Sequence, residues 1–135
     1  GMWTPTRVPQ GSAPSCVQQS KRLNLLFLCS RNQWRSPTAE RLWRKTPGLS
    51  TRSAGLSKSA RRRVTEADVI WADAILVMEE AHKSRLARDH RATVADTPIH
   101  VLDIPDVYRF MDPELVALLQ TAVTPILTSL EHRRR

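Results

Sequence analysis

The chain has 135 residues, 41% of them hydrophobic, and a formal net charge of +8 at pH 7. This length suits one compact domain with a hydrophobic core and is too short for two. No stretch approaches the roughly 20 apolar residues that cross a bilayer, and no apolar secretory signal opens the chain. We therefore expect a cytoplasmic protein that makes no membrane contact, whose positive charge favours nucleic acid or phosphorylated ligands.

The N-terminal segment has the composition of a tail. Residues 1–21 are rich in Pro, Gly, Ser, Gln and Thr and show no apolar period. Gly1 ahead of Met2 resembles a scar left by tag cleavage. We expect residues 1–21 to be disordered, residues 22–132 to form the domain, and residues 133–135 to be a basic end.

The first predicted elements are a strand and a helix joined by a tight turn. Residues 23–29 (LNLLFLC) are almost all apolar, which is typical of a strand buried on both faces of a parallel sheet. Polar residues 30–34 form the turn. Residues 36–45 then predict a helix, because Pro37 suits its first turn.

The middle of the chain alternates strands with helices. Residues 50–54 are a weak strand candidate. Thr65 starts a helix by the capping-box pattern, with Asp68 at the position where Glu is usual. Residues 74–78 (AILVM) predict a second apolar strand, and residues 79–90 a charged helix.

The last elements are a strand over residues 99–104 and a C-terminal helix. Asp112, Pro113 and Glu114 mark the helix start, as an N-cap, a first-turn proline and an acid near the positive end of the dipole. Pro125 must kink this helix or restart it. The alternation predicts a single α/β domain with a parallel sheet, whose ligands bind beyond the carboxyl ends of the strands.

The segment CSRNQWRSP carries the chemistry. It places Cys29 at the end of a strand and Arg35 six residues later, where a helix begins. The backbone between them can turn its N–H groups toward one tetrahedral anion, and the helix N-terminus adds positive potential that favours a thiolate. Arg35 can hold two phosphoryl oxygens, Ser36 can donate a hydrogen bond to the thiolate, and Asn32 suits a left-handed position.

These roles predict Cys29 as a nucleophile and Arg35 as a phosphate clamp. The expected phosphate-binding residues are Ser30, Arg31, Asn32, Gln33, Trp34, Arg35 and Ser36. The spacing of Cys29 and Arg35 alone occurs often by chance, and a cysteine at a strand end is usually a small hydrophobic residue. The neighbouring strand, Asn32 and the helix strengthen the prediction. No histidine pairs with a cysteine at zinc-site spacing, so no metal is expected.

The segment LLFLCSRNQWRSPTAE resembles the phosphate loop of the low-molecular-weight protein tyrosine phosphatases. The resemblance extends to RSAGLS, to ADAILVMEEAH and to DIPDVYRFMDPEL, and is strongest to a short branch described as predicted tyrosine phosphatases. It implies a three-layer α/β/α domain with a four-stranded parallel sheet, a phosphocysteine intermediate and no cofactor. The implied partners are a phosphorylated protein or a small phosphomonoester, with inorganic phosphate or sulfate in the loop.

The resemblance also implies a general acid after the last strand, because a leaving alkoxide or phenoxide needs a proton. Our first choice is Asp106, with Tyr108 as the aromatic wall of the pocket. Asp103 lies nearer the strand end and is the second choice. Asp112 precedes a proline, as the family's acid does, but is better explained as an N-cap.

The chain departs from the family pattern in three places. Arg31 replaces a glycine, and Trp34 replaces a second cysteine and is expected to pack in the core. The segment between Gly55 and Val64 is short and lacks a family helix that walls the pocket, which puts tyrosine specificity in doubt. The basic run Arg61–Arg63 in this segment either contacts a second anionic group or is a solvated face.

Two other functions compete with a phosphatase. One is a phosphate- or nucleic-acid-binding module without catalysis, which the net charge fits. Interleaved aromatic residues for nucleic acid are missing, so a nucleic-acid partner is not expected. The other is an arsenate reductase, which needs further cysteines, whereas Cys16 in the predicted tail is the only other thiol.

Overall fold

The structure is a computed structural model that describes residues 22–134. The predicted tail, residues 1–21, and Arg135 lie outside the described residues. The elements are β1 (Leu23–Cys29), α2 (Arg35–Trp43), β2 (Leu49–Gly55), α3 (Glu66–Trp71), β3 (Ala74–Val77), α4 (Glu80–Asp89), β4 (Ile99–Val101) and α5 (Pro113–Arg134).

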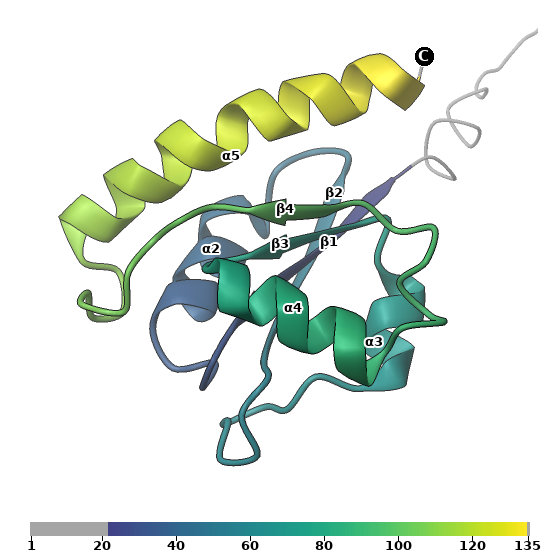
Figure 1. The fold of residues 1–135 in the computed structure, drawn as a ribbon. Helices are drawn as coiled ribbons and strands as arrows, with labels where there is room; N and C mark the ends of the chain where they lie inside the picture. Colours follow the sequence, from purple (N-terminus) through teal and green to yellow (C-terminus); the bar gives the residue numbers. More distant parts are fainter. Residues whose placement is uncertain (1–21, 135) are drawn as a thin grey trace, which may run out of the picture.

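The four strands form one parallel sheet in the order β2-β1-β3-β4. Helices α2 and α5 cover one face, and α3 and α4 cover the other (Figure 1). This three-layer arrangement confirms the predicted fold class. Strand β1 lies between β2 and β3, so the chain leaves it toward one side and returns on the other. A ligand crevice is expected at such a reversal, beyond the carboxyl end of β1.

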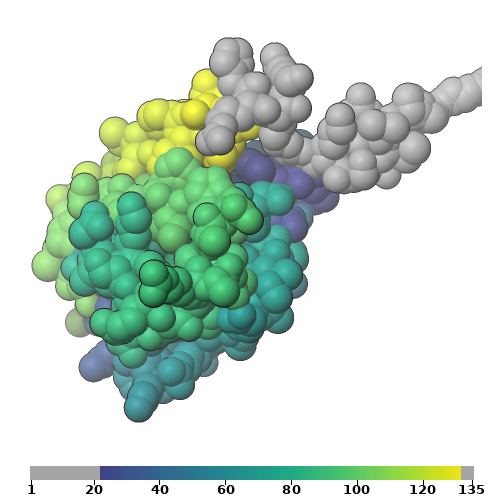
Figure 2. Space-filling view, turned by 45° about the vertical axis from the view of Figure 1, so that its right-hand side comes forward, coloured from purple at the N-terminus to yellow at the C-terminus, as the bar shows by residue number. Residues whose placement is uncertain are grey.

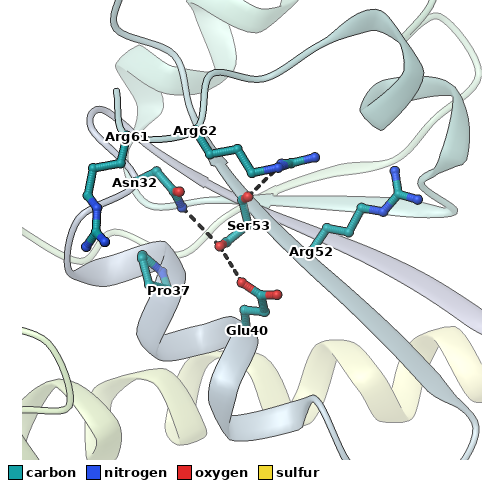
Figure 3. A pocket seen from close by; sticks show the side chains of 7 residues that line it. All are labelled: Asn32, Pro37, Glu40, Arg52, Ser53, Arg61 and Arg62. Atoms are coloured by element: carbon teal, nitrogen blue, oxygen red, sulfur yellow. Dashed lines mark hydrogen bonds between the residues drawn. The ribbon is translucent and has the colours of Figure 1, made fainter. Parts of the chain in front are cut away.

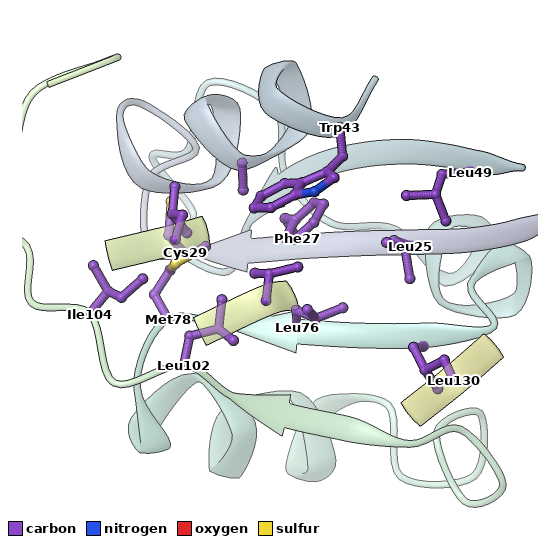
Figure 4. Packing of buried hydrophobic residues seen from close by; sticks show 14 of the residues in the cluster. Leu25, Phe27, Cys29, Trp43, Leu49, Leu76, Met78, Leu102, Ile104 and Leu130 are labelled. Atoms are coloured by element: carbon purple, nitrogen blue, oxygen red, sulfur yellow. The ribbon is translucent and has the colours of Figure 1, made fainter. Parts of the chain in front are cut away.

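The apolar sequence of β1 supplies both layers of the core. Leu25, Phe27 and Cys29 pack in the cluster beneath α2 and α5, which Figure 4 shows. Leu26 and Leu28 point to the opposite face and pack with residues of α3 and α4. Successive side chains of a strand alternate between faces, so a strand that is apolar on both faces from Leu25 to Cys29 needs a helix on each side. The core therefore fixes Cys29 at the edge of the α2–α5 layer.

Two predicted helix starts are confirmed. Thr65 Oγ1 accepts a hydrogen bond from the Asp68 N–H (3.2 Å), and the Asp68 carboxylate accepts one from the Thr65 N–H (3.0 Å), which completes the capping box. At the start of α5, Asp112 Oδ1 accepts a hydrogen bond from the Glu114 N–H (2.9 Å). Asp112 is therefore engaged as a helix cap.

The predicted end of the last strand differs most from the structure. Strand β4 has three residues rather than the six predicted over 99–104, since Asp103 takes a left-handed conformation (φ 56°). Backbone bonds from Leu102 to Val77 and from Ile104 to Met78 still hold this segment against β3 (2.8 Å each). Helix α5 continues through Pro125, so of the two predicted effects of this proline, a kink or a restart, the restart is wrong.

Helix α5 also corrects the expectation about membrane-length segments. Residues Pro113–Glu131 have a mean hydropathy of 1.2, which is enough by length and composition to span a bilayer. Leu115, Leu119 and Val123 lie on one side of the helix and are fully buried against the sheet, whereas Leu118 is exposed. The helix lies on the outside of the domain (Figure 2), and its exposed side carries Gln120, Thr121 and other polar residues. This pattern is that of an amphipathic helix packed on a sheet.

Candidate active site

The segment after β1 forms a loop around the Cys29 thiol. Asn32 has φ 54°, as predicted, and this left-handed turn aims its backbone N–H at Cys29 Sγ (3.2 Å). Asparagine tolerates this conformation better than most residues. Arg31 replaces the family glycine without a positive φ, so arginine causes no backbone strain at that position.

Three successive carbonyl groups of the loop face away from the thiol and accept hydrogen bonds from the segment 56–61. These bonds join Leu56 N to Cys29 O (3.0 Å), Ser57 N to Ser30 O (2.8 Å) and Arg61 N to Arg31 O (2.9 Å). Because these carbonyl groups accept hydrogen bonds on the side away from the thiol, the N–H groups of the loop can turn toward an anion beside the thiol.

Gly55 allows this close approach of the segment to the loop. A Cβ atom at Gly55 would lie 2.6 Å from the carbonyl oxygen of Ser30 and 2.6 Å from the Cβ atom of Ala60. Both distances are well below contact distance, so any side chain would displace the loop. Glycine is required here by space rather than by backbone conformation.

A series of linked side-chain hydrogen bonds begins at the thiol and runs below the loop. Ser36 Oγ lies 3.0 Å from Cys29 Sγ and accepts a hydrogen bond from Asn32 Nδ2 (3.0 Å). The same amide group donates to Ser53 Oγ (3.0 Å), which in turn donates to Glu40 Oε1 (2.5 Å). The Ser36 hydroxyl has two possible acceptors for its own proton, Cys29 Sγ at 3.0 Å and the Ala54 carbonyl oxygen at 3.4 Å. The contact with sulfur is the shorter one and is consistent with the hydrogen bond that the sequence predicts.

Arg35 is buried and held at one nitrogen. Its Nη1 donates to the Glu79 carboxylate, just beyond β3, and to the Ile104 carbonyl oxygen (2.8 Å). Its Nε lies 3.6 Å from Asp106 Oδ1. These contacts use both protons of Nη1 and leave the Nε–Nη2 edge of the guanidinium without a hydrogen bond in the described chain. That edge has the geometry that grips two oxygens of a phosphoryl group.

A cavity of about 200 Å³ opens onto the thiol, and we call it the thiol cavity. Its lining residues are Cys29, Arg31, Gln33, Trp34, Arg35 and Asp106. Trp34 is half-buried there, with the Arg109 guanidinium 5.8 Å from its ring centre. The expectation that Trp34 packs in the core is therefore wrong, because the loop turns its ring to the cavity wall.

The three candidates for the general acid differ in their distance from the thiol cavity and in their contacts. Asp106 lines the thiol cavity, whereas Asp103 is exposed and does not line it. Asp112 caps α5. Tyr108 does not line the cavity either, since its ring packs against the core under α5 and its hydroxyl donates to Glu114 (3.1 Å). That hydrogen bond raises the pKa of Tyr108 above its usual value.

Comparison with known proteins places this geometry in a known fold. No family model and no curated protein sequence matches the chain. Solved structures do match. The tyrosine phosphatase Wzb from Escherichia coli K30 is 25% identical, with a TM-score of 0.63 over 79% of this chain and 97% of that one. A low-molecular-weight phosphotyrosine phosphatase from Vibrio cholerae is 19% identical, with a TM-score of 0.61 over 82% and 98%. The chain has the low-molecular-weight protein tyrosine phosphatase fold.

A third match shows that this phosphatase fold serves more than one substrate class. The YwlE arginine phosphatase from Geobacillus stearothermophilus is 21% identical, with a TM-score of 0.58 over 82% of this chain and 97% of that one. The resemblance predicted from the loop sequence is confirmed. In this phosphatase fold, the loop after β1 carries the candidate site.

Sequence reasoning missed two residues of the site, Glu79 and His82. Glu79 follows β3, which lies beside β1, so the carboxyl ends of these parallel strands bring it to Arg35. His82 is buried in the first turn of α4, and its Nε2 lies 2.9 Å from Ser30 Oγ. The position of Glu79 directly after an apolar strand was a usable signal. Nothing in the sequence pairs His82 with Ser30.

The hydrogen bonds of His82 define its tautomer. Its Nδ1 accepts from the Glu79 N–H (3.1 Å), so Nε2 carries the proton and donates to Ser30 Oγ. Burial lowers the pKa of His82 below its usual value, and the positive charge of Arg35 lowers it further. Glu79 and Asp106 act in the opposite direction, and Arg85 adds to the lowering. His82 therefore links the Glu79 turn to the phosphate loop as a neutral ring.

Protonation of His82 should destabilise the fold. As the pH falls below about 6.5, the unfolded chain binds this proton before the folded chain does. The free energy of unfolding therefore decreases as the pH decreases. We expect His82→Asn, which keeps an acceptor for the Glu79 N–H, to reduce that slope by up to about 1.4 kcal/mol per pH unit. Urea unfolding from about pH 7.5 down to about pH 5.5 measures it.

His82→Gln is the matched variant, since it keeps a donor near Ser30 and also does not titrate. Both variants should show the shallower slope, whatever their stability at neutral pH. An unchanged slope in both would contradict a neutral His82 in the folded chain.

Proposed function

We propose that residues 22–132 form a phosphomonoester hydrolase that acts through a phosphocysteine intermediate on Cys29. The observation that carries the proposal is the thiol cavity, where Cys29 Sγ, the Arg35 guanidinium and the Asp106 carboxylate line one small space. The thiol receives the Asn32 N–H and the Ser36 hydroxyl, which favour the charged, nucleophilic form of sulfur.

In the first step the Cys29 thiolate attacks phosphorus, the Sγ–P bond forms and the bond to the leaving oxygen breaks. Asp106, protonated at this stage, gives its proton to that oxygen. In the second step a water molecule attacks the phosphocysteine and passes a proton to Asp106. The Sγ–P bond then breaks, and the thiolate leaves toward the Ser36 hydroxyl and the Asn32 N–H.

Arg35 supports both steps by holding the phosphoryl group. Its Nε–Nη2 edge, where Asp106 Oδ1 now lies 3.6 Å from Nε, can donate two parallel hydrogen bonds to equatorial oxygens when the phosphoryl group takes that place. Glu79 and Ile104 hold the other side of the guanidinium. Glu79 is a positioning residue in this scheme. The loop N–H groups from Ser30 to Ser36 complete the phosphate site, as the sequence predicts.

Structurally similar proteins support the anion site and the covalent step. The Wzb phosphatase from Escherichia coli has been solved with phosphate and with sulfate, and the one from Vibrio vulnificus with benzylphosphonate. A cysteine-to-serine variant of the YwlE arginine phosphatase carries a phosphorylated active-site serine. We infer that Cys29 takes the corresponding phosphoryl group here.

The substrate class that we favour is a phosphorylated protein, with a cytoplasmic site of action. The matched structures include both tyrosine and arginine phosphatases. The thiol cavity, at about 200 Å³, is small, and Tyr108 does not line it. Phosphotyrosine and phosphoarginine peptides should therefore be compared directly.

The test of the proposal is hydrolysis of p-nitrophenyl phosphate by the full chain between about pH 5 and pH 8 without added metal. We expect turnover that is highest on the acid side of neutrality. A chain that binds inorganic phosphate but hydrolyses no phosphomonoester would instead be a phosphate-binding module.

A further inference from the structure

A second and larger cavity lies on the other side of the phosphate loop. It has a volume of about 680 Å³, and its walls include Asn32, Glu40, Arg52, Arg61 and Arg62 (Figure 3). We call it the arginine groove. It opens between the start of α2 and the segment that follows β2, and no step of the proposed mechanism uses it.

The loop itself separates the groove from the thiol cavity. The Asn32 backbone N–H points at Cys29, whereas its side-chain amide points toward the groove and donates to Ser53. Arg31 lines the thiol cavity, and its carbonyl oxygen accepts the Arg61 N–H (2.9 Å). Arg61, which lines the groove, is therefore bonded to the residue that lines the thiol cavity. A substrate long enough to cross the loop can reach both spaces.

The charges of the groove are not balanced. Arg52 and Arg62 share one carboxylate, Asp68 Oδ1, at 3.2 and 2.6 Å. Asp68 is charged, because hydrogen bonds from Arg62 and Thr65 outweigh the effect of burial and lower its pKa. Each of the two arginines keeps a side chain more than two-fifths exposed, so each retains surface for a ligand.

Arg61 is the uncompensated charge. Across residues 22–134 its guanidinium has no hydrogen bond or ion pair, and it is exposed at the groove wall (Figure 3). Glu40, the remaining acid of the groove, accepts from Ser53 Oγ (2.5 Å). With Asp68 included, three arginines face two carboxylates, and Arg31 adds a further positive charge on the thiol-cavity side of the loop.

We propose that the arginine groove is a second anion subsite that binds an acidic side chain flanking the phosphorylated residue of a protein substrate. The proposal rests on the proposed phosphatase function and names its substrate class, which is phosphoproteins with Glu or Asp beside the phosphorylated residue. Charge complementarity of this kind changes affinity between related ligands and is weakened by salt.

The test uses the full chain with Cys29→Ala, which has no nucleophile and so binds without turnover, and two phosphotyrosine peptides of equal length. One peptide has Glu on both sides of the phosphotyrosine and the other has Gln. We expect the Glu peptide to bind about threefold to fivefold more tightly at low salt. Arg61→Ala should remove that preference, and Arg61→Glu should reverse it. Arg61→Glu with Cys29 intact should hydrolyse p-nitrophenyl phosphate within about twofold of the wild-type rate.

Arg91→Glu is the matched control, since Arg91 is exposed, lines neither space and carries the same charge. An equal loss of preference in Arg91→Glu would overturn the subsite and leave a general electrostatic effect. Equal affinity of the Glu and Gln peptides for the parent chain would also overturn it, even if both bind through the phosphoryl group. Absence of p-nitrophenyl phosphate hydrolysis by the wild type would count against the phosphatase alone, because peptide preference is measured without turnover.

Discussion

Cys29→Ser should abolish hydrolysis of p-nitrophenyl phosphate, with a loss in kcat of about 10⁴-fold or more. A serine hydroxyl stays protonated at neutral pH and is a poor nucleophile, whereas the cysteine acts as a thiolate. The exchange is nearly isosteric, so the contacts of Ser36 and Asn32 with this position remain. The measurement is initial rates of wild type and variant, with phosphate binding followed by calorimetry.

Phosphate binding is the control for this variant. Arg35 and the loop N–H groups are unchanged, and the negative thiolate is gone, so the variant should bind phosphate at least as tightly as the wild type. Loss of binding together with activity would point to a damaged loop. A variant with the wild-type rate would exclude the phosphocysteine mechanism.

Asp106→Asn should slow hydrolysis by about 10² to 10⁴-fold for substrates with poor leaving groups, and much less for p-nitrophenyl phosphate. An asparagine cannot give a proton to the leaving oxygen, and a nitrophenolate hardly needs one. The measurement is kcat across a series of aryl and alkyl phosphates, plotted against the basicity of the leaving group. An equal loss across the series would contradict Asp106 as the acid.

Asp103→Asn and Asp112→Asn are the matched controls, because each removes one negative charge near the same loop. Asn at position 112 also preserves the cap of α5, since Asn and Asp are equally good N-cap residues. Both variants should keep wild-type leaving-group dependence. If Asp103→Asn shows the steep dependence instead, the loop 103–108 rearranges when substrate binds, and Asp103 is the acid.

The sequence predicts the fold well because its signals are local. An almost entirely apolar run is enough to place β1 inside a parallel sheet, and Thr65 with Asp68 is enough to start α3. The end of β4 was not predictable, since Leu102 and Ile104 continue the apolar pattern while Asp103 breaks the strand through its backbone conformation. Pro125 lies on the exposed side of α5, and the helix continues through it because the packing of its other side holds it in place.

The residues of the candidate site also fall into those that the sequence predicts and those that it does not. Asn32 was predictable because the left-handed turn is a property of its own backbone. Trp34 was not, because the direction of its side chain depends on how the loop closes over β1. Glu79 is 44 residues from its partner Arg35 in the sequence, and His82 is 52 residues from its partner Ser30. Such contacts depend on the order of strands in the sheet, which local patterns do not encode.

The outward-facing carbonyl groups of residues 29–31 bear on how the proposed reaction ends. A loop that became ordered only around its ligand would lose about 1–2 kcal/mol of binding free energy for each backbone residue it fixed. Here the segment 56–61 orders that part of the loop when the chain folds. Inorganic phosphate, the product, therefore meets a site that needs little rearrangement, and we expect it to compete with substrate. Phosphate would then inhibit turnover as a competing product. The strength of this inhibition would depend on the same backbone hydrogen bonds that shape the site.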